Sequence, residues 1–176
     1  MQDKWFIKSF LISLIFLGCD DDTGYVPGSI LAAQEEKEKE EAARQEKRQD
    51  AIILINDGKT ALEKVVADIS DMIDLWNAVK DVERATNRAE LALVSLGSVD
   101  EKFTDASVLL DMSYTCENNY LVNLRRIANY CSSFLNKFID YLDDEEHDPL
   151  KLDDANQYFF QAQREIDEYR ALPSCN

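Results

Sequence analysis

The fold class follows from residues 121–142, LVNLRRIANYCSSFLNKFIDYL. Apolar residues recur in this stretch at steps of three and four, which is the spacing of one face of an α-helix. One line of that face consists of Leu124, Ile127, Cys131, Phe134, Phe138 and Tyr141. A second line consists of Leu121, Ala128, Leu135 and Leu142. A face with two apolar lines indicates a helical bundle, because the seam of a two-stranded coiled coil is narrower.

The same heptad extends toward the N-terminus, through Phe103, Ala106, Leu110, Ser113, Glu117 and Tyr120. Ser98 and Glu101 have the spacing of a capping box, in which each side chain satisfies a backbone N–H group of the other residue. These patterns predict a helix over residues 99–142. Glu117 interrupts its apolar face, so either this turn faces water or the register slips there.

A second long helix is predicted over residues 60–96. Thr60 and Glu63 form another capping box, and Asn56-Asp57-Gly58 is expected to break the chain before it. Gly97 is a plausible C-terminal stop, because glycine commonly ends helices. The apolar face between these ends consists of Leu62, Val65, Ile69, Met72, Trp76, Val79, Val82, Ala85, Ala89, Ala92 and Leu96.

The third predicted helix covers residues 149–172. Asp148 is a good N-cap, and Pro149 suits the first helical position. The residues before it, 143–148, form an acidic loop, and Pro173 ends the helix. Short loops make consecutive helices antiparallel. The chain is therefore expected to be all-α, an up-down bundle of the helices 60–96, 99–142 and 149–172.

A charged segment precedes the bundle. Residues 29–50 are rich in Ala, Glu, Lys, Arg and Gln, which are strong helix formers, and they carry no apolar stripe. We expect a solvated helical stalk over about residues 30–56, whose Ile52–Ile55 end joins the bundle. The alternative is a frayed, partly disordered segment. The bundle domain itself is expected over residues 51–176.

The N-terminus has the three parts of a secretory signal. Lys4 and Lys8 are basic, residues 10–17 are apolar, and Gly18 is a small residue before a cleavage point. A membrane-spanning helix needs about 20 apolar residues, so this run is too short to span well. Residues 1–18 are therefore predicted to be a signal peptide, and residues 19–28 a flexible tether.

Residues 14–19, Leu-Ile-Phe-Leu-Gly-Cys, resemble the lipobox of bacterial lipoproteins. The resemblance covers residues 1–19 only. It implies cleavage before Cys19, a diacylglycerol on its sulfur and an acyl chain, typically palmitate, on its new N-terminus. The protein would then be anchored by lipid to a bacterial membrane, with its domain on the periplasmic or extracellular side. The alternatives are an ordinary signal peptide that leaves Cys19 as a thiol, and an uncleaved N-terminal anchor.

The acidic cluster Asp20-Asp21-Asp22 leaves the choice of membrane open. An Asp after the lipidated Cys resembles the inner-membrane retention signal of enteric-type lipoproteins. In other bacterial groups an acidic cluster at this place resembles a surface-export signal. The net charge of −16 disfavours nucleic acid as a partner.

Three further cysteines follow Cys19. If residues 99–142 fold back on residues 149–172 about the acidic loop, Cys116 comes to lie opposite Cys175, because their midpoint falls near Glu145. We predict a disulfide between them, for which loop-closure entropy gives about 4 kcal/mol. Cys131 lies on the apolar seam and is expected to be a buried free thiol. A reactive or partner-bridging thiol is the alternative for Cys131.

Candidate functional residues are few. The sequence contains no HExxH, GxSxG, P-loop, GxGxxG or CxxCH motif, so we expect neither an enzyme nor a cofactor. Asp143, Asp144 and His147 are weak candidates for cation ligands, but they lack the spacing of an EF-hand or a zinc site. Solvation of this loop is the preferred interpretation, and no metal site is predicted.

Most of the aromatic residues have helical spacing and are expected in the core. Tyr158 and Phe160 flank the seam residue Phe159, so both cannot be buried by one seam. One of them is a candidate contact for a partner. Taken together, the patterns favour a non-enzymatic, membrane-tethered interaction module that binds another protein of the cell envelope, in an adaptor, assembly, inhibitor or exclusion role. The alternative is a bundle that binds a small ligand or a divalent cation, in its core or at residues 143–148.

Overall fold

The computed structural model describes residues 28–173 and residue 175, and all regular secondary structure in this part of the chain is helical. The four helices are α1 (Gly28–Val79), α2 (Val82–Leu109), α3 (Thr115–Leu142) and α4 (Pro149–Arg170). The predicted signal peptide, residues 1–18, and the predicted lipidation site Cys19 lie outside the described residues. The chain divides into two compact units, 1–38 and 39–176, and the helical bundle belongs entirely to the second.

The bundle is held together by buried residues spaced at steps of three and four. In α1 these buried positions are Ala51, Ile55, Gly58, Leu62, Val65, Ile69, Met72 and Trp76. In α2 they are Ala85, Ala89, Ala92, Leu96, Val99, Phe103 and Ala106. Burying one large apolar side chain contributes roughly 1.5–3 kcal/mol, so packing of these stripes outweighs local propensity in fixing the helices.

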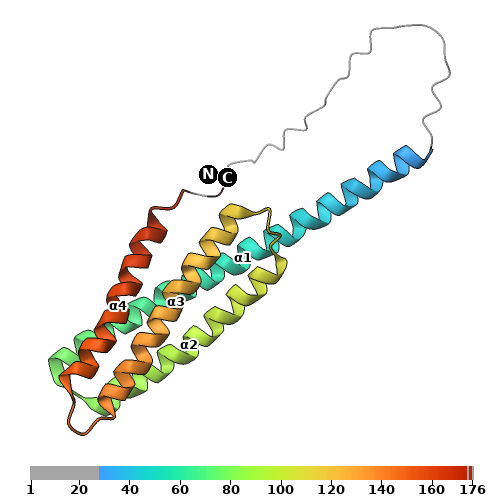
Figure 1. The fold of residues 1–176 in the computed structure, drawn as a ribbon. Helices are drawn as coiled ribbons and strands as arrows, with labels where there is room; N and C mark the ends of the chain where they lie inside the picture. Colours follow the sequence, from blue (N-terminus) through green and yellow to red (C-terminus); the bar gives the residue numbers. More distant parts are fainter. Residues whose placement is uncertain (1–27, 174, 176) are drawn as a thin grey trace, which may run out of the picture. The chain divides into compact units, whose positions relative to one another are not determined.

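Successive helices of the bundle run in opposite directions (Figure 1). α3 packs against α2 on one side and against α4 on the other. The part of α1 from residue 39 onward contributes to the same core. Trp76 makes edge-to-face contacts with Phe138 and Tyr141 of α3, and Lys59 lies over the ring of Tyr169 in α4. α1 is therefore a full member of the bundle.

The predicted helix break at residues 56–58 is wrong, because α1 runs through it. Gly58 is buried and occupies the core position between Ile55 and Leu62. A Cβ atom at Gly58 would lie 2.5 Å from Cε1 of Phe103 in α2. Glycine at this position therefore allows two helices to approach closely.

The predicted stop at Gly97 is also wrong. α2 continues to Leu109, and Gly97 is exposed on its surface with no side chain near enough to contact a Cβ atom. Glycine inside a helix costs about 1 kcal/mol relative to alanine. Burial of Leu96, Val99 and Phe103 on the opposite face outweighs that cost.

The predicted helix 60–96 is instead divided at Lys80 and Asp81. Lys80 adopts a left-handed conformation with φ of 57°, and the Asp81 carboxylate accepts a hydrogen bond of 3.0 Å from the backbone N–H of Arg84. The buried positions change register at this point. Seven residues after Trp76 the heptad reaches Glu83, whereas the next buried side chain is Ala85.

The predicted helix 99–142 is divided between Leu109 and Thr115. The Asp111 carboxylate accepts a hydrogen bond of 2.9 Å from the N–H of Ser113, and the Asn118 amide donates to the carbonyls of Asp111 and Tyr114. These local bonds replace the helical ones across the turn. The heptad pattern does not predict this turn, because Phe103 in α2 and Leu124 in α3 have the same heptad phase.

The end of α3 and the start of α4 agree with the boundaries predicted from the sequence. The acidic loop separates α3 from α4, and the Asp148 side chain accepts a hydrogen bond of 3.0 Å from the N–H of Leu150. Pro149 occupies the first position of α4, as predicted. The helix ends at Arg170, two residues before the predicted end.

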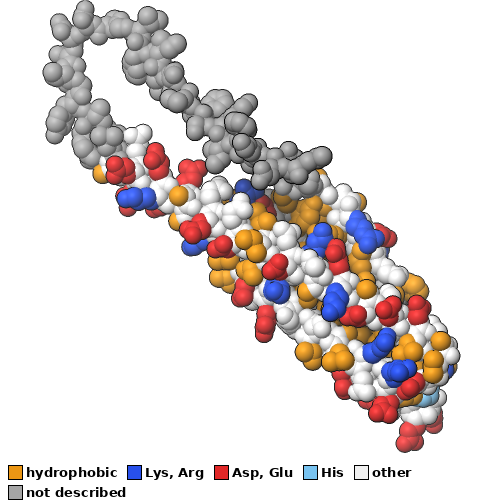
Figure 2. Space-filling view, turned by 180° about the vertical axis from the view of Figure 1, so that it is seen from behind, with side chains coloured by type: hydrophobic (Ala, Val, Ile, Leu, Met, Phe, Trp, Pro, Cys, Tyr) orange, Lys and Arg blue, Asp and Glu red, His pale blue; other side chains and the backbone are white. Residues whose placement is uncertain are grey.

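Acidic side chains are distributed over the visible surface of the bundle, with basic and hydrophobic groups among them (Figure 2). The side chains of residues 32–47 in α1 are all exposed. None of the described helices combines the length and the apolar character that are needed to cross a bilayer.

Candidate functional site

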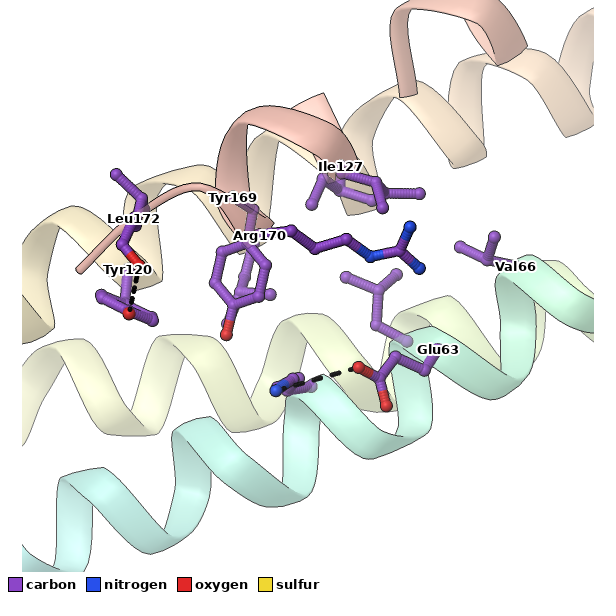
Figure 3. Close-up of a pocket in the computed structure, with 11 residues that line it drawn as sticks. Glu63, Val66, Tyr120, Ile127, Tyr169, Arg170 and Leu172 are labelled. Carbon is purple, nitrogen blue, oxygen red and sulfur yellow. Dashed lines mark hydrogen bonds and ion pairs between the residues drawn. The ribbon is translucent and has the colours of Figure 1, made fainter. Parts of the chain in front are cut away.

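A groove of about 480 Å³ lies between α1, α3 and α4 (Figure 3). Apolar side chains from all three helices line it, namely Leu62, Val66, Leu124, Ile127 and Ile166. Small-molecule and peptide sites are typically concave and largely apolar, with a few polar groups that fix orientation, and their volumes are roughly 300–1,000 Å³. The groove has this character.

Two cations and one carboxylate flank the apolar lining. Lys59 Nζ lies 5.6 Å from the ring centre of Tyr169 and 3.9 Å from the carboxylate of Glu63. The Arg170 side chain extends from α4 toward the side of α1 that carries Val66 (Figure 3). Arg170 also lies 3.8 Å from the carboxylate of Asp167, so a partner that enters the groove meets apolar contacts beside two exposed ion pairs.

Tyr120 and Tyr169 form one end of the groove. Their rings pack edge to face with centres 5.2 Å apart. Partial burial raises the pKa of Tyr169, and the neighbouring Tyr120 and Glu63 raise it further. Tyr169 therefore keeps its hydroxyl proton at neutral pH and can donate a hydrogen bond at the edge of the apolar lining.

The C-terminal residues close this end. The Tyr120 hydroxyl donates a hydrogen bond of 2.7 Å to the carbonyl of Pro173, and Leu172 lines the groove. Cys175 forms a disulfide with Cys116 of α3, with Cα atoms 5.7 Å apart. This is the pair that folding the chain about the acidic loop predicts.

Cys131 is a buried free cysteine, in agreement with its place on the seam. Burial raises the pKa of the Cys131 thiol to about 12. Because the thiolate is the reactive form, this side chain is chemically inert in the folded protein at neutral pH.

His147 is half-buried in an otherwise largely exposed loop. Its ring packs against those of Trp76 and Tyr141, with centres 6.1 Å and 5.4 Å away, and its Nδ1 lies 3.3 Å from the carbonyl oxygen of Tyr141. Lys80 Nζ lies over the ring of Trp76, 4.8 Å from its centre. His147 therefore covers the end of the aromatic core.

At least one carboxylate of the acidic loop already has a bonding partner within the chain. Asp144 accepts from the Lys151 ammonium at 3.0 Å, and that contact lowers the pKa of Asp144. Asp143 is exposed. Within residues 28–173 and residue 175, no group of three or more His, Cys, Asp or Glu side chains is arranged to hold a metal ion.

The two aromatic residues that flank Phe159 differ in exposure. Tyr158 is half-buried and packs against the core, whereas 67% of Phe160 is exposed. Phe160 is therefore the one that is available at the surface. It lies on α4 but does not line the groove.

One buried contact was not foreseen from the sequence. Glu117 is 5% exposed and accepts a hydrogen bond of 2.8 Å from Nε of Arg48, and the Arg48 guanidinium also lies over the ring of Tyr114. From the sequence, Arg48 is expected on a solvated stalk, and the turn at Glu117 is expected either to face water or to slip in register. A signal was present, since a lone carboxylate on an apolar face requires a cation.

Comparisons of the chain with protein-family models, with curated proteins and with solved structures found no match.

Proposed function

We propose that this chain is a lipid-anchored module of the bacterial cell envelope that binds another envelope protein and has no catalytic role. Residues 1–18 would be the signal peptide, Cys19 the lipidated residue, residues 19–28 the tether and residues 29–50 the spacer. The support for anchoring is the order of Lys4, Lys8, the apolar run 10–17 and Gly18-Cys19. Two or more acyl chains hold a protein stably on a membrane, whereas one binds only marginally.

The observation that carries the binding function is the groove between α1, α3 and α4. Its apolar lining and its tyrosine and arginine edge have the composition of an interface centre, where aromatic residues and arginine are enriched. The partner would insert apolar side chains and place acidic groups near Lys59 and Arg170. The adaptor, assembly, inhibitor and exclusion roles all use such a contact.

Cross-linking in intact cells followed by purification of the full-length lipidated protein in detergent tests this proposal. The variant Lys59→Glu/Arg170→Glu reverses the two cations at the groove. Lys64→Glu/Arg164→Glu is its matched control, because it makes the same charge change on the same two helices at exposed positions outside the lining.

The expected result is a specific partner that the wild type and the control capture and that the groove variant loses. Capture of the same partner by both variants would place the binding surface elsewhere. Finding no specific partner at all would remove the proposed function.

A small amphipathic ligand is a second candidate for the same groove, because the volume of about 480 Å³ is in the usual range for such sites. Lipid extracts should then raise the melting temperature of the wild type, and the variant Lys59→Glu/Arg170→Glu should not show this rise. A divalent cation at the acidic loop is tested in the same way with Ca²⁺ and the variant Asp143→Asn/Asp144→Asn. An unchanged melting temperature in both experiments would exclude these ligands.

A further inference from the structure

The C-terminal residues lie where α4 would continue if it were longer. α2 and α3 each have 28 residues, whereas α4 has 22 and ends at Arg170. At 1.5 Å per residue the difference is about 9 Å of helix. Beyond α4, Leu172 lines the groove and Cys175 lines a second hollow, while Ala171 and Pro173 are exposed. We call these four residues the strap.

The second hollow lies next to the groove, beyond Tyr120 and Tyr169. Its volume is about 260 Å³. α1 contributes Ile52 and Ile55 to it, and α3 contributes Glu117. The two hollows share three lining residues, Lys59, Tyr120 and Tyr169, and Cys175 lines the second one. They are therefore neighbouring parts of one seam.

The strap is held in this seam by few contacts. The Tyr120 hydroxyl bonds to the carbonyl of Pro173 at 2.7 Å, and Leu172 lines the groove. The backbone N–H of Leu172 also donates a hydrogen bond of 3.1 Å to the carbonyl of Tyr169, and Cys175 is joined covalently to Cys116 in α3. Both cysteines are partly exposed, in contrast to the fully buried Cys131.

We propose that the strap is an internal occupant of the partner site, and that reduction of the Cys116–Cys175 disulfide releases it and joins the two hollows into one groove. The opened seam would take an apolar segment of the partner in the place of the missing end of α4. This inference rests on the proposed function, because it concerns the same groove.

The chemistry is thiol–disulfide exchange with a dithiol. One thiolate of the dithiol attacks a sulfur of the Cys116–Cys175 bond and forms a mixed disulfide, and its second thiol resolves that bond. The dithiol is oxidised to a disulfide, and Cys116 and Cys175 each become a thiol. Two electrons and two protons are transferred, and Cys131 takes no part.

Hydrogen exchange of the full-length protein tests the release without any partner. Samples are compared with the disulfide intact, after reduction with dithiothreitol and alkylation, and as the variant Cys116→Ser/Cys175→Ser. Alkylation reaches the released cysteines only, because Cys131 is buried and protonated.

Reduction is expected to speed exchange about tenfold or more in residues 52–59 and 117–124, with little change in residues 128–142. The Cys116→Ser/Cys175→Ser variant should match the reduced wild type, and binding of a hydrophobic dye should rise in both. Tyr120→Phe, which loses the hydroxyl bond to Pro173 but keeps the ring, should exchange like the wild type once both are reduced, because the released strap no longer makes this bond.

Equal acceleration in every helix would mean that the disulfide only stabilises the bundle, and unchanged exchange at 52–59 and 117–124 would mean that the strap stays in place. Either result overturns the inference. Neither affects the cell capture experiment, in which the groove variant and its control still decide the proposed function.

Discussion

At the scale of single residues, the two glycines of the bundle have opposite roles. Gly58 is buried, and a Cβ atom there would lie 2.5 Å and 2.9 Å from two carbons of the Phe103 ring. Gly97 is exposed, and nothing lies within 4 Å of a Cβ atom at its position. Both residues lie within helices with negative φ, so backbone conformation does not require glycine at either place.

Alanine substitutions should therefore change stability in opposite directions. Gly97→Ala should stabilise the protein by about 0.5–1 kcal/mol through helix propensity. Gly58→Ala should gain the same propensity but lose about 1–3 kcal/mol to overpacking, because the Phe103 ring is fully buried and cannot move aside. Urea unfolding measures both. A stabilised Gly58→Ala variant would contradict the close approach of α1 and α2.

The pair Arg48–Glu117 is the second residue-scale feature. Removing one partner of a buried ion pair leaves an uncompensated charge, so Arg48→Ala should destabilise the protein by about 3 kcal/mol. Arg48→Met/Glu117→Met removes both charges and should recover most of that loss. A double-mutant cycle in urea checks this, and additive effects of the two single substitutions would show that the pair is not coupled.

Cys131 offers a test through its reactivity. In the folded protein a thiol reagent at pH 8 should leave Cys131 unmodified, and denaturation should expose one thiol in the otherwise oxidised bundle. The folded-state pKa of about 12 lies above the ordinary value of 9.0. The stabilising contribution of the protonated thiol is therefore complete below pH 9 and is lost as pH rises toward 12. Rapid labelling without denaturant would contradict burial in the core.

At the scale of elements, the boundary between α1 and α2 depends on Asp81. Its carboxylate bonds to the N–H of Arg84 and caps α2. Asp81→Ala should cost about 1 kcal/mol in thermal unfolding, whereas Asp74→Ala, at an exposed position inside α1, should stay within about 0.5 kcal/mol of the wild type. Equal effects would show that the cap is not what begins α2.

Local start signals predicted one helix end correctly and two wrongly, because the capping-box patterns that begin at Thr60 and Ser98 lie inside α1 and α2. Asp148 and Pro149 form a start signal that needs no tertiary partner, and α4 begins there. The pairing of Cys116 with Cys175 also followed, because both lie equally far from the loop about which the chain folds back.

The other boundaries could not be predicted from local patterns, because packing decides them. Gly58 resembles a helix breaker until Phe103 is known to lie against it. The turn at residues 110–114 joins two helices with one continuous heptad, so the pattern predicted a single helix. The division of the predicted helix 60–96 was also missed, because Val79 and Val82 continue the apolar spacing from Trp76 to Ala85, whereas in the structure Val79 is exposed.

The groove was missed for a related reason. Tyr120 and Tyr169 occur at helical spacing and were assigned to the core, and nothing in the sequence places Lys59 beside them. The three residues come from three helices, and the contact of Lys59 with Tyr169 joins positions far apart in the chain. A site assembled in this way requires the packing of the whole bundle.

At the scale of the whole molecule, a charged helical segment leads into a helical bundle with a groove, and we propose a lipid anchor at Cys19 before them. Strong negative charge keeps such a domain soluble and away from anionic lipid surfaces, so a covalent lipid would have to hold it at the membrane. The strap and its disulfide would then control the groove on a domain that stays near its partner.

The most direct test of this account is the intact mass of the native protein extracted from membranes, measured with and without reductant. The account predicts a chain that starts at Cys19 and carries a diacylglycerol and an acyl chain. Reduction should add two hydrogens, from the Cys116–Cys175 disulfide. A chain that starts at Met1, or one that carries no lipid, would contradict the anchoring on which the proposed function rests.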